Sequence, residues 1–113
     1  MIVKDKITLR ELERMAKNMF DDLVKAVVDV EKGAMAVDAP MHSDEEAELI
    51  QNGSKQQNLW GINLRPTFFG TDDFVEFDSM INLRPGQNNR SRSVDDPKLR
   101  EKIIKIVDKI VIK

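Results

Sequence analysis

Arginine, asparagine and acidic side chains recur in the second half of the chain, in a pattern that could bind an anion. The pentapeptide INLRP occurs twice, at Ile62–Pro66 and Ile81–Pro85, and an Arg-rich loop follows the second copy. Arginine and asparagine present planar groups of hydrogen-bond donors that suit phosphate or carboxylate. We predict a ligand-binding surface made of Asn63, Arg65, Glu76, Asp78, Asn82, Arg84, Asn89, Arg90 and Arg92.

Salt bridges on a solvated sheet face would explain the same charged residues without any ligand. Asparagine argues against that explanation, because it has a poor propensity for strands and gains little from pairing in water. The Arg-rich loop leads into a helix N-terminus, but Asp95 and Asp96 stand there and would repel an anion. A third interpretation is that Arg84, Arg90 and Arg92 anchor the loop onto acidic neighbours.

The only histidine, His42, could take part in acid–base or metal chemistry. If the predicted hairpins adjoin, Asp38 and Asp78 could converge with His42, and a hard cation would accept their oxygen atoms. A lone histidine beside an acidic helix is more often a surface residue, and Ser79 has no nucleophile motif around it. The chain has no cysteine, which excludes thiol catalysis and thiolate metal ligands.

The N-terminal segment predicts a short strand followed by a helix. Ile2–Val3 is apolar and suits a short edge strand. Thr8 and Glu11 have the spacing of a capping box, in which each side chain accepts a hydrogen bond from the other residue's free backbone N–H. The apolar residues that follow recur at helical spacing up to about Asp22.

A β-hairpin is predicted next. Leu23–Val30 is rich in β-branched residues, and Ala34–Asp38 returns after a turn in which Gly33 supplies the positive φ. We expect the hairpin to pair Val30 with Met35 and Val28 with Val37 on one face, and to place Val27 and Asp38 on the other.

A short helix and two strands are predicted in the middle of the chain. Ser43 and Glu46 form a second capping box, for a helix over Asp44–Asn52 that a glycine ends. The strands are Asn58–Arg65 and Phe74–Arg84, and each contains one INLRP copy.

Strand geometry would separate the side chains of each INLRP copy, because alternate residues point to opposite faces of a sheet. The isoleucine and leucine of each copy would lie on the apolar face, and the asparagine and arginine on the polar face. The hairpin turn would place Glu76 across from Asn63, and Asp78 across from Gly61.

The last element is a helix that Asp96 caps and Pro97 begins, after a polar loop over Pro85–Asp96. The whole pattern predicts a single α+β domain over residues 1–113, with the element order β-α-ββ-α-ββ-α. We expect two layers: a mainly antiparallel sheet of two hairpins and an edge strand, with the two long helices on one face and one short helix.

Composition narrows the classes of function. The formal net charge is −2, so there is no global basic field and nucleic-acid binding is not expected. No stretch has the apolar length of a membrane span, and the first residues are too charged for a signal peptide. We predict a cytoplasmic protein without a cofactor.

Two phenylalanines, Phe68 and Phe69, stand at the predicted hairpin tip, where turn residues are normally polar. They either fold back under the sheet or contact a second subunit. An acidic segment, Asp38–Ile50, and a basic one, Arg84–Arg100, could also meet across a dimer. We predict a homodimer.

Most of the chain resembles a small prokaryotic family that is described as a domain of unknown function. The most specific motif is Glu76–Pro85, and Leu59–Asn63 accompanies it. The family pattern has glycine where this chain has Asn88. The resemblance implies a compact cytoplasmic domain and implies no reaction. The further segments that carry it are His42–Glu46, Gly53–Ser54, Asn89–Arg92 and Asp95–Pro97.

These observations favour a non-enzymatic binding or assembly module. Its Asn/Arg-rich sheet face and loop would bind a small anionic ligand or an acidic surface of a protein partner. The alternative function is a small metal-assisted hydrolase that uses Asp38, His42 and Asp78.

Overall fold

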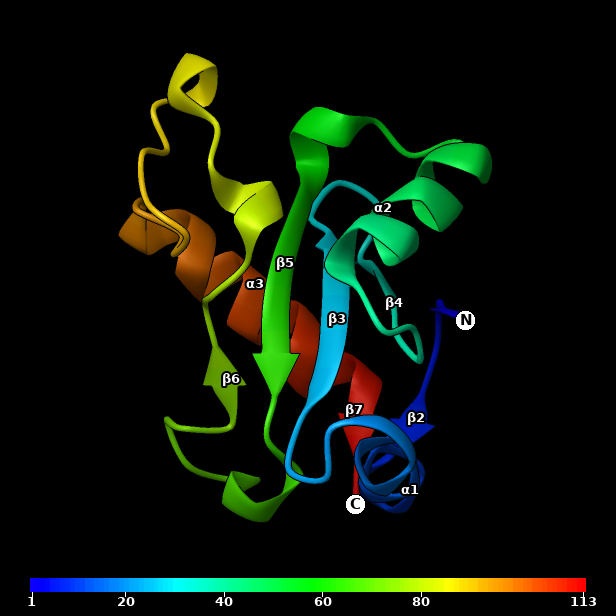
Figure 1. The fold of residues 1–113 in the computed structure, drawn as a ribbon. Helices are drawn as coiled ribbons and strands as arrows, with labels where there is room; N and C mark the ends of the chain where they lie inside the picture. The colour runs from blue at the N-terminus through cyan, green and yellow to red at the C-terminus, as the bar shows by residue number, and fades with distance from the viewer.

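The computed structural model describes all 113 residues, and its centre is a five-stranded sheet with the order β1-β4-β3-β5-β6 (Figure 1). Every neighbouring pair of strands in this sheet is antiparallel. The predicted α+β class and the edge strand at the N-terminus are confirmed. The strands are β1 (Ile2–Val3), β3 (Val24–Asp29), β4 (Ala34–Ala36), β5 (Leu59–Leu64) and β6 (Val75–Glu76).

The two long helices, α1 (Leu9–Met19) and α3 (Pro97–Ile110), begin at the predicted caps. Thr8 and Glu11 form the predicted capping box, with N···O distances of 3.1 and 3.2 Å. The Asp96 carboxylate accepts a hydrogen bond from the Lys98 backbone N–H at 2.9 Å. None of the helices is both long enough and apolar enough to span a membrane.

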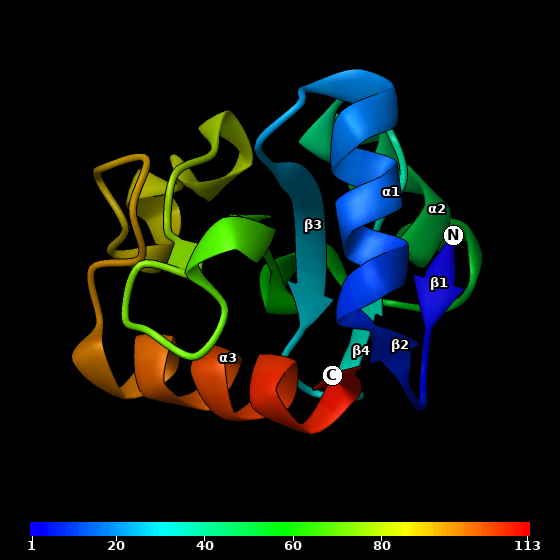
Figure 2. The same ribbon diagram turned by 90° about the horizontal axis from the view of Figure 1, so that it is seen from below.

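Both long helices contribute to the main hydrophobic core. Leu12 and Ala16 of α1, and Ile103, Val107 and Ile110 of α3, are buried in one cluster with a single face of the sheet. Figure 2 shows α3 running beneath the sheet, while α1 crosses one end of it. The sheet residues of this cluster include Val24, Ala26, Val28, Met35, Val37, Trp60, Ile62 and Leu64.

The short helix α2 (His42–Gln51) lies on the opposite face of the sheet, which we call the α2 face (Figure 1). There Leu49 forms a second, smaller core with Val27, Ala36 and Leu59. The sequence predicted a solvated polar face on this side. Helix α2 covers one part of the α2 face, and the predicted polar residues lie on the part that it leaves open.

The predicted capping box of α2 is wrong. The helix begins at His42 instead of Asp44, Met41 is its N-cap, and no side chain caps it. The reason is that Glu46 turns away from the helix end and forms an ion pair with Arg84, at 3.5 Å. The predicted stop after Asn52 is confirmed, since Gly53 has a φ of +97°.

A second, two-stranded sheet joins the ends of the chain, and it was not predicted from the sequence. Strand β2 (Ile7–Thr8) pairs in parallel with β7 (Val111–Ile112). The last two apolar residues, Val111 and Ile112, therefore form a strand beyond α3. Both strands have only two residues, which is too short for a period-two pattern to be recognised.

The register of the β3–β4 hairpin differs from the prediction by two residues. Val28 pairs with Met35, and Asp29 pairs with Ala34. Strand β3 ends early because the Asp29 carboxylate accepts the backbone N–H groups of Glu31 and Lys32, at 2.9 and 3.0 Å. A shift of two residues preserves the faces, so the residues predicted to share a face still do.

The second INLRP copy is not a strand, which corrects the prediction of a strand over Phe74–Arg84. Strand β6 stops at Glu76, and a 3-10 turn occupies Met80–Asn82. The Ser79 hydroxyl accepts the Ile81 N–H at 3.3 Å and starts that turn. Glu76 does pair with Asn63 as predicted, but Asp78 does not pair with Gly61.

Candidate functional site

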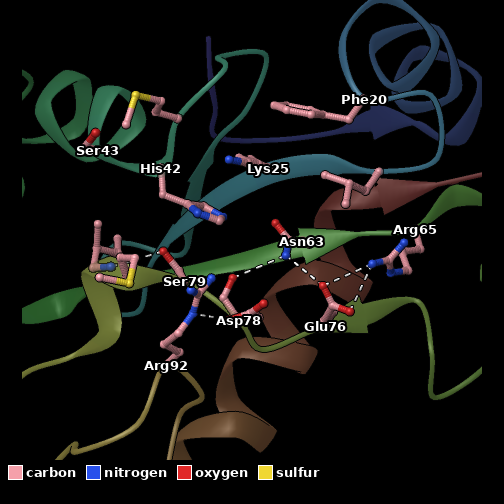
Figure 3. Close-up of a pocket in the computed structure, with 14 residues that line it drawn as sticks. Phe20, Lys25, His42, Ser43, Asn63, Arg65, Glu76, Asp78, Ser79 and Arg92 are labelled. Carbon is pink, nitrogen blue, oxygen red and sulfur yellow. Dashed lines mark hydrogen bonds and ion pairs between the residues drawn. The ribbon is translucent and has the colours of Figure 1, made fainter.

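A pocket of about 450 Å³ lies over the part of the α2 face that the helix leaves open (Figure 3). Five of the predicted ligand-binding residues line this pocket, and so does His42. The polar residues that line it are Lys25, His42, Ser43, Asn63, Arg65, Glu76, Asp78, Ser79 and Arg92.

Three adjacent strands place a row of polar side chains across the pocket floor. Lys25 of β3 is directly opposite Asn63 of β5, which is directly opposite Glu76 of β6. Because directly opposed residues point to the same face of a sheet, the three side chains lie on the α2 face. The row therefore runs from a cation, through an amide, to a carboxylate.

Asn63 is 6% exposed and has one unsatisfied polar atom. Its Nδ2 donates to Glu76 Oε1 at 2.8 Å and to the Asp78 carbonyl oxygen at 3.3 Å. Since both partners are acceptors, they fix which end of the amide is nitrogen. Oδ1 is buried without a partner, and Figure 3 shows it directed toward the space between His42 and Lys25.

His42 is the first residue of α2 and is 8% exposed. Its Nε2 lies 2.7 Å from the Ile62 carbonyl oxygen. Burial lowers the pKa of the imidazole, which favours the neutral ring. A carbonyl can only accept, so Nε2 carries the proton, and Nδ1 is left as a hydrogen-bond acceptor.

The N-terminus of α2 opens beside His42. Met41, His42 and Ser43 all line the pocket. The Met41 carbonyl accepts the backbone N–H groups of Asp44 and Glu45, whereas those of His42 and Ser43 have no partner within the protein. Free N–H groups and the helix dipole together attract negative charge.

Lys25 is the cation of the pocket that has no carboxylate partner. Its Nζ lies 4.9 Å from the centre of the Phe20 ring and forms no salt bridge. In Figure 3 its amine extends toward His42 and the start of α2. Lys25 was not among the residues predicted to bind a ligand. The only indication of its role in the sequence is that it is the one charged residue in the apolar strand segment VKAVV.

The two arginines of the pocket are already paired. Arg65 contacts both oxygens of Glu76, at 3.3 and 3.1 Å, and Asp22 at 3.1 Å. The hydrogen bond with Glu76 is the main cause of the raised pKa of Arg65. Arg92 donates to Asp78 at 2.7 Å, and both side chains of this pair are about half exposed.

Asn82 does not line the pocket, although the preceding residue, Ile81, does. The Asn82 side chain is fully buried. Its Oδ1 accepts the Gly61 N–H at 2.8 Å, and its Nδ2 donates to the Gly61 carbonyl at 2.9 Å. Nδ2 also lies 3.0 Å from the Arg92 carbonyl. The amide thus satisfies the edge of β5 at the point where β6 no longer does.

Arg84 and Asn89 are also held by contacts within the protein. The Arg84 guanidinium donates to the carbonyls of Ile81, Gln56 and Leu59, and lies 4.6 Å from the centre of the Trp60 ring. Asn89 accepts the Asp95 N–H at 2.8 Å and donates to the Asn82 and Ser93 carbonyls. Arg84 therefore anchors this segment mainly through backbone carbonyls, and through only one of the acidic neighbours that the interpretation named, Glu46 at 3.5 Å.

Asn88 takes the left-handed conformation that glycine favours, with a φ of +61°. The turn before the Asn-Arg-Ser-Arg stretch is therefore kept without glycine, because asparagine tolerates this region better than most residues. Arg90, which follows, is exposed and does not line the pocket.

The predicted metal triad is not assembled. His42 and Asp78 line the pocket, but Asp38 does not, and no group of three or more acidic or histidine side chains is close enough to hold a metal ion. Asp38 has a φ of +66°, and it is exposed.

Only one of the two phenylalanines at the hairpin tip folds back. Phe69 packs edge-to-face against Phe74, with 5.1 Å between ring centres. Phe68 is 45% exposed.

The family described as "Protein of unknown function (DUF5674)" matches residues 1–110 of the chain. No curated protein matches the chain. No solved structure matches it either.

Proposed function

Since the chain belongs to the DUF5674 family, whose description assigns no activity, we propose from the pocket alone that the protein binds a small molecule with an anionic group. The observation that carries the proposal is the unpaired Lys25 amine beside the free N–H groups of α2. This assignment keeps the predicted binding of an anionic ligand and moves its centre from the arginines to Lys25.

The charges of the pocket support this assignment. Three cations, Lys25, Arg65 and Arg92, face two carboxylates, Glu76 and Asp78, which leaves one positive charge when His42 is neutral. Both arginines are paired with those carboxylates. The excess charge is therefore located at Lys25, where a bound anion would form charge-assisted hydrogen bonds.

The size of the pocket suits a small metabolite. Sites for small molecules usually have volumes of roughly 300–1,000 Å³, and this pocket has about 450 Å³. Apolar side chains, among them Phe20, Leu23 and Met41, cover the rest of its wall. The ligand would therefore place its anionic group at Lys25 and an apolar part against this wall.

Lys25→Gln tests the proposal in a thermal-shift assay with inorganic phosphate, phosphosugars and short carboxylates. Saturation at a hundred times Kd stabilises a protein by about 2.7 kcal/mol, which raises Tm by several degrees in a domain of this size. We expect such a shift in the wild type and its loss in Lys25→Gln. Separate phosphate and carboxylate series identify which anion is preferred.

Lys102→Gln is the matched control, because Lys102 is an exposed lysine of α3 outside the pocket. It makes the same change in net charge and should retain the full shift. No shift with any anion, or an equal shift in Lys25→Gln, would contradict the proposal.

A further inference from the structure

The pocket presents unmet acceptors next to its cationic end. Asn63 Oδ1 is buried without a hydrogen-bond partner, which is rare for a polar atom in a folded protein. Leaving such an atom unpaired destabilises the folded protein. A lysine amine or a helix N–H at this point would satisfy Oδ1, but neither is bonded to it. An N–H or O–H group of a ligand would do so.

His42 adds a second acceptor to the same space. Its Nε2–H is committed to the Ile62 carbonyl, so its Nδ1 lone pair is free. Figure 3 shows the imidazole and the Asn63 amide on either side of one opening. Two acceptors of this kind match a group with several hydrogens on one nitrogen.

Negative charge lies on the other side of Asn63 from these acceptors. Glu76 accepts from the Asn63 amide, and the Asp78 carboxylate lies in the same wall (Figure 3). Lys25 and the start of α2, where His42 lies, are on the same side of Asn63 as the two acceptors. The space between Asn63, His42 and Lys25 therefore presents both acceptors and positive charge, which suits a ligand that carries a donor group and an anionic group close together.

We propose that the ligand is an α-amino acid, whose carboxylate faces Lys25 and the N-terminus of α2 and whose ammonium group donates to Asn63 Oδ1 and His42 Nδ1. The two charged groups of an α-amino acid are joined through one carbon, which fits acceptors and a cation that surround a single space. Its side chain would lie against Phe20, Leu23 and Met41. This inference rests on the proposed anion binding and adds the second charge.

The first experiment is a thermal-shift screen of the full chain with the twenty protein amino acids. The amino acid with the largest shift is then compared by calorimetry with its two deletion analogues, the acid without the amine and the amine without the carboxylate. We expect removal of the amine to weaken binding about tenfold or more, which is the loss of one charge-assisted hydrogen bond. Removal of the carboxylate should weaken it at least as much.

Two variants test which residue binds the amine of the ligand and which binds its carboxylate. In Asn63→Leu, the amino acid and its analogue without the amine should bind with nearly equal affinity. In Lys25→Gln, the amino acid and its analogue without the carboxylate should do so. The analogue series on the wild type needs no variant, so the test holds even if Asn63→Leu does not fold.

The outcomes separate the two proposals. If the acid without the amine binds as tightly as the amino acid and depends on Lys25, the anion site stands and the amino-acid assignment fails. If no amino acid binds while phosphate compounds do, the assignment fails in the same way. If no ligand of either kind binds, both proposals fail.

Discussion

The two INLRP copies have identical sequences and opposite structural roles. In the first copy, Asn63 and Arg65 extend from a strand and line a pocket. In the second, Asn82 and Arg84 turn inward and bind backbone groups of the neighbouring segments. The first copy thus leaves the Asn63 Oδ1 atom free for a ligand, whereas the fold uses both side chains of the second copy.

The residue that decides between these roles is Gly61, which precedes the first copy. A Cβ atom at this position would lie 2.5 Å from the Cβ and Oγ of Ser79. Because Gly61 has no side chain, the chain after Asp78 can cross close over β5 instead of continuing beside it as a strand. A strand motif can therefore be overruled by a contact eighteen residues away in the sequence.

Replacement of the two asparagines by leucine gives the largest predicted contrast. Asn82→Leu would leave the Gly61 N–H, the Gly61 carbonyl and the Arg92 carbonyl without their partner, so we expect it to lower the free energy of unfolding by about 3 kcal/mol or more. Asn63→Leu removes bonds to the partly exposed Glu76 and to Asp78, and should lower it by about 1 kcal/mol. Urea denaturation measures both values, and equal losses would contradict the comparison.

Replacement of the two arginines by methionine should give a smaller contrast of the same sign. The Arg84 side chain is 10% exposed and donates to three carbonyls, so we expect Arg84→Met to lower the free energy of unfolding by about 2 kcal/mol. Arg65→Met removes partly exposed ion pairs and should lower it by less than about 1 kcal/mol.

Tryptophan fluorescence gives a second measurement for these arginine variants. Trp60 is the only tryptophan, and the Arg84 guanidinium lies over its ring. The emission should change in folded Arg84→Met and stay constant in Arg65→Met. An unchanged emission in Arg84→Met would show that the stacking is absent.

Helix α2 contacts both INLRP copies. It also carries a buried carboxylate, Glu45, which should make the stability of the protein depend on pH. Through this helix, His42 binds Ile62 of the first copy, and Glu46 binds Arg84 of the second. Burial raises the pKa of Glu45 from its ordinary value of 4.5 to about 9. The folded state thus holds this proton more tightly than the unfolded state, so its contribution to stability is full below pH 4.5 and is lost as pH rises through 9.

We therefore expect the wild type to lose stability between pH 7 and 9, and Glu45→Gln to show a flatter profile. Glu13→Gln is the control, because Glu13 is an exposed carboxylate of α1. Denaturation midpoints at several pH values measure the slopes, and parallel profiles for all three proteins would contradict the prediction.

The parts of the fold that local signals determine could be predicted from the sequence. The capping box of Thr8 and Glu11, the Asp96 cap and the strand of the first copy each depend on residues within a few positions of one another. The second copy could not be predicted, because its conformation depends on the packing of Ser79 over Gly61. The covered half of the α2 face was missed for the same reason, since a helix pattern does not say which face the helix covers.

Only those site residues that local strand patterns determine could be predicted from the sequence. Strand alternation and the hairpin turn predicted that one polar face would hold Asn63, Arg65 and Glu76. The structure confirms the pairing of Asn63 with Glu76, and all three residues line the pocket. Lys25 was missed because one charge in an apolar strand does not break its pattern. The start of α2 was missed because Ser43 and Glu46 imitate a capping box, which moved the expected helix two residues away from His42.

The hydrogen bonds between Asn82 and Gly61 also bear on how the molecule behaves at high concentration. A sheet edge with free N–H and C=O groups can recruit a strand from another molecule and start aggregation. Beyond the two residues of β6, the Asn82 amide occupies both backbone groups of Gly61. A side chain thereby closes the part of the edge where the strand is missing, and leaves a second molecule no template for growth at that position.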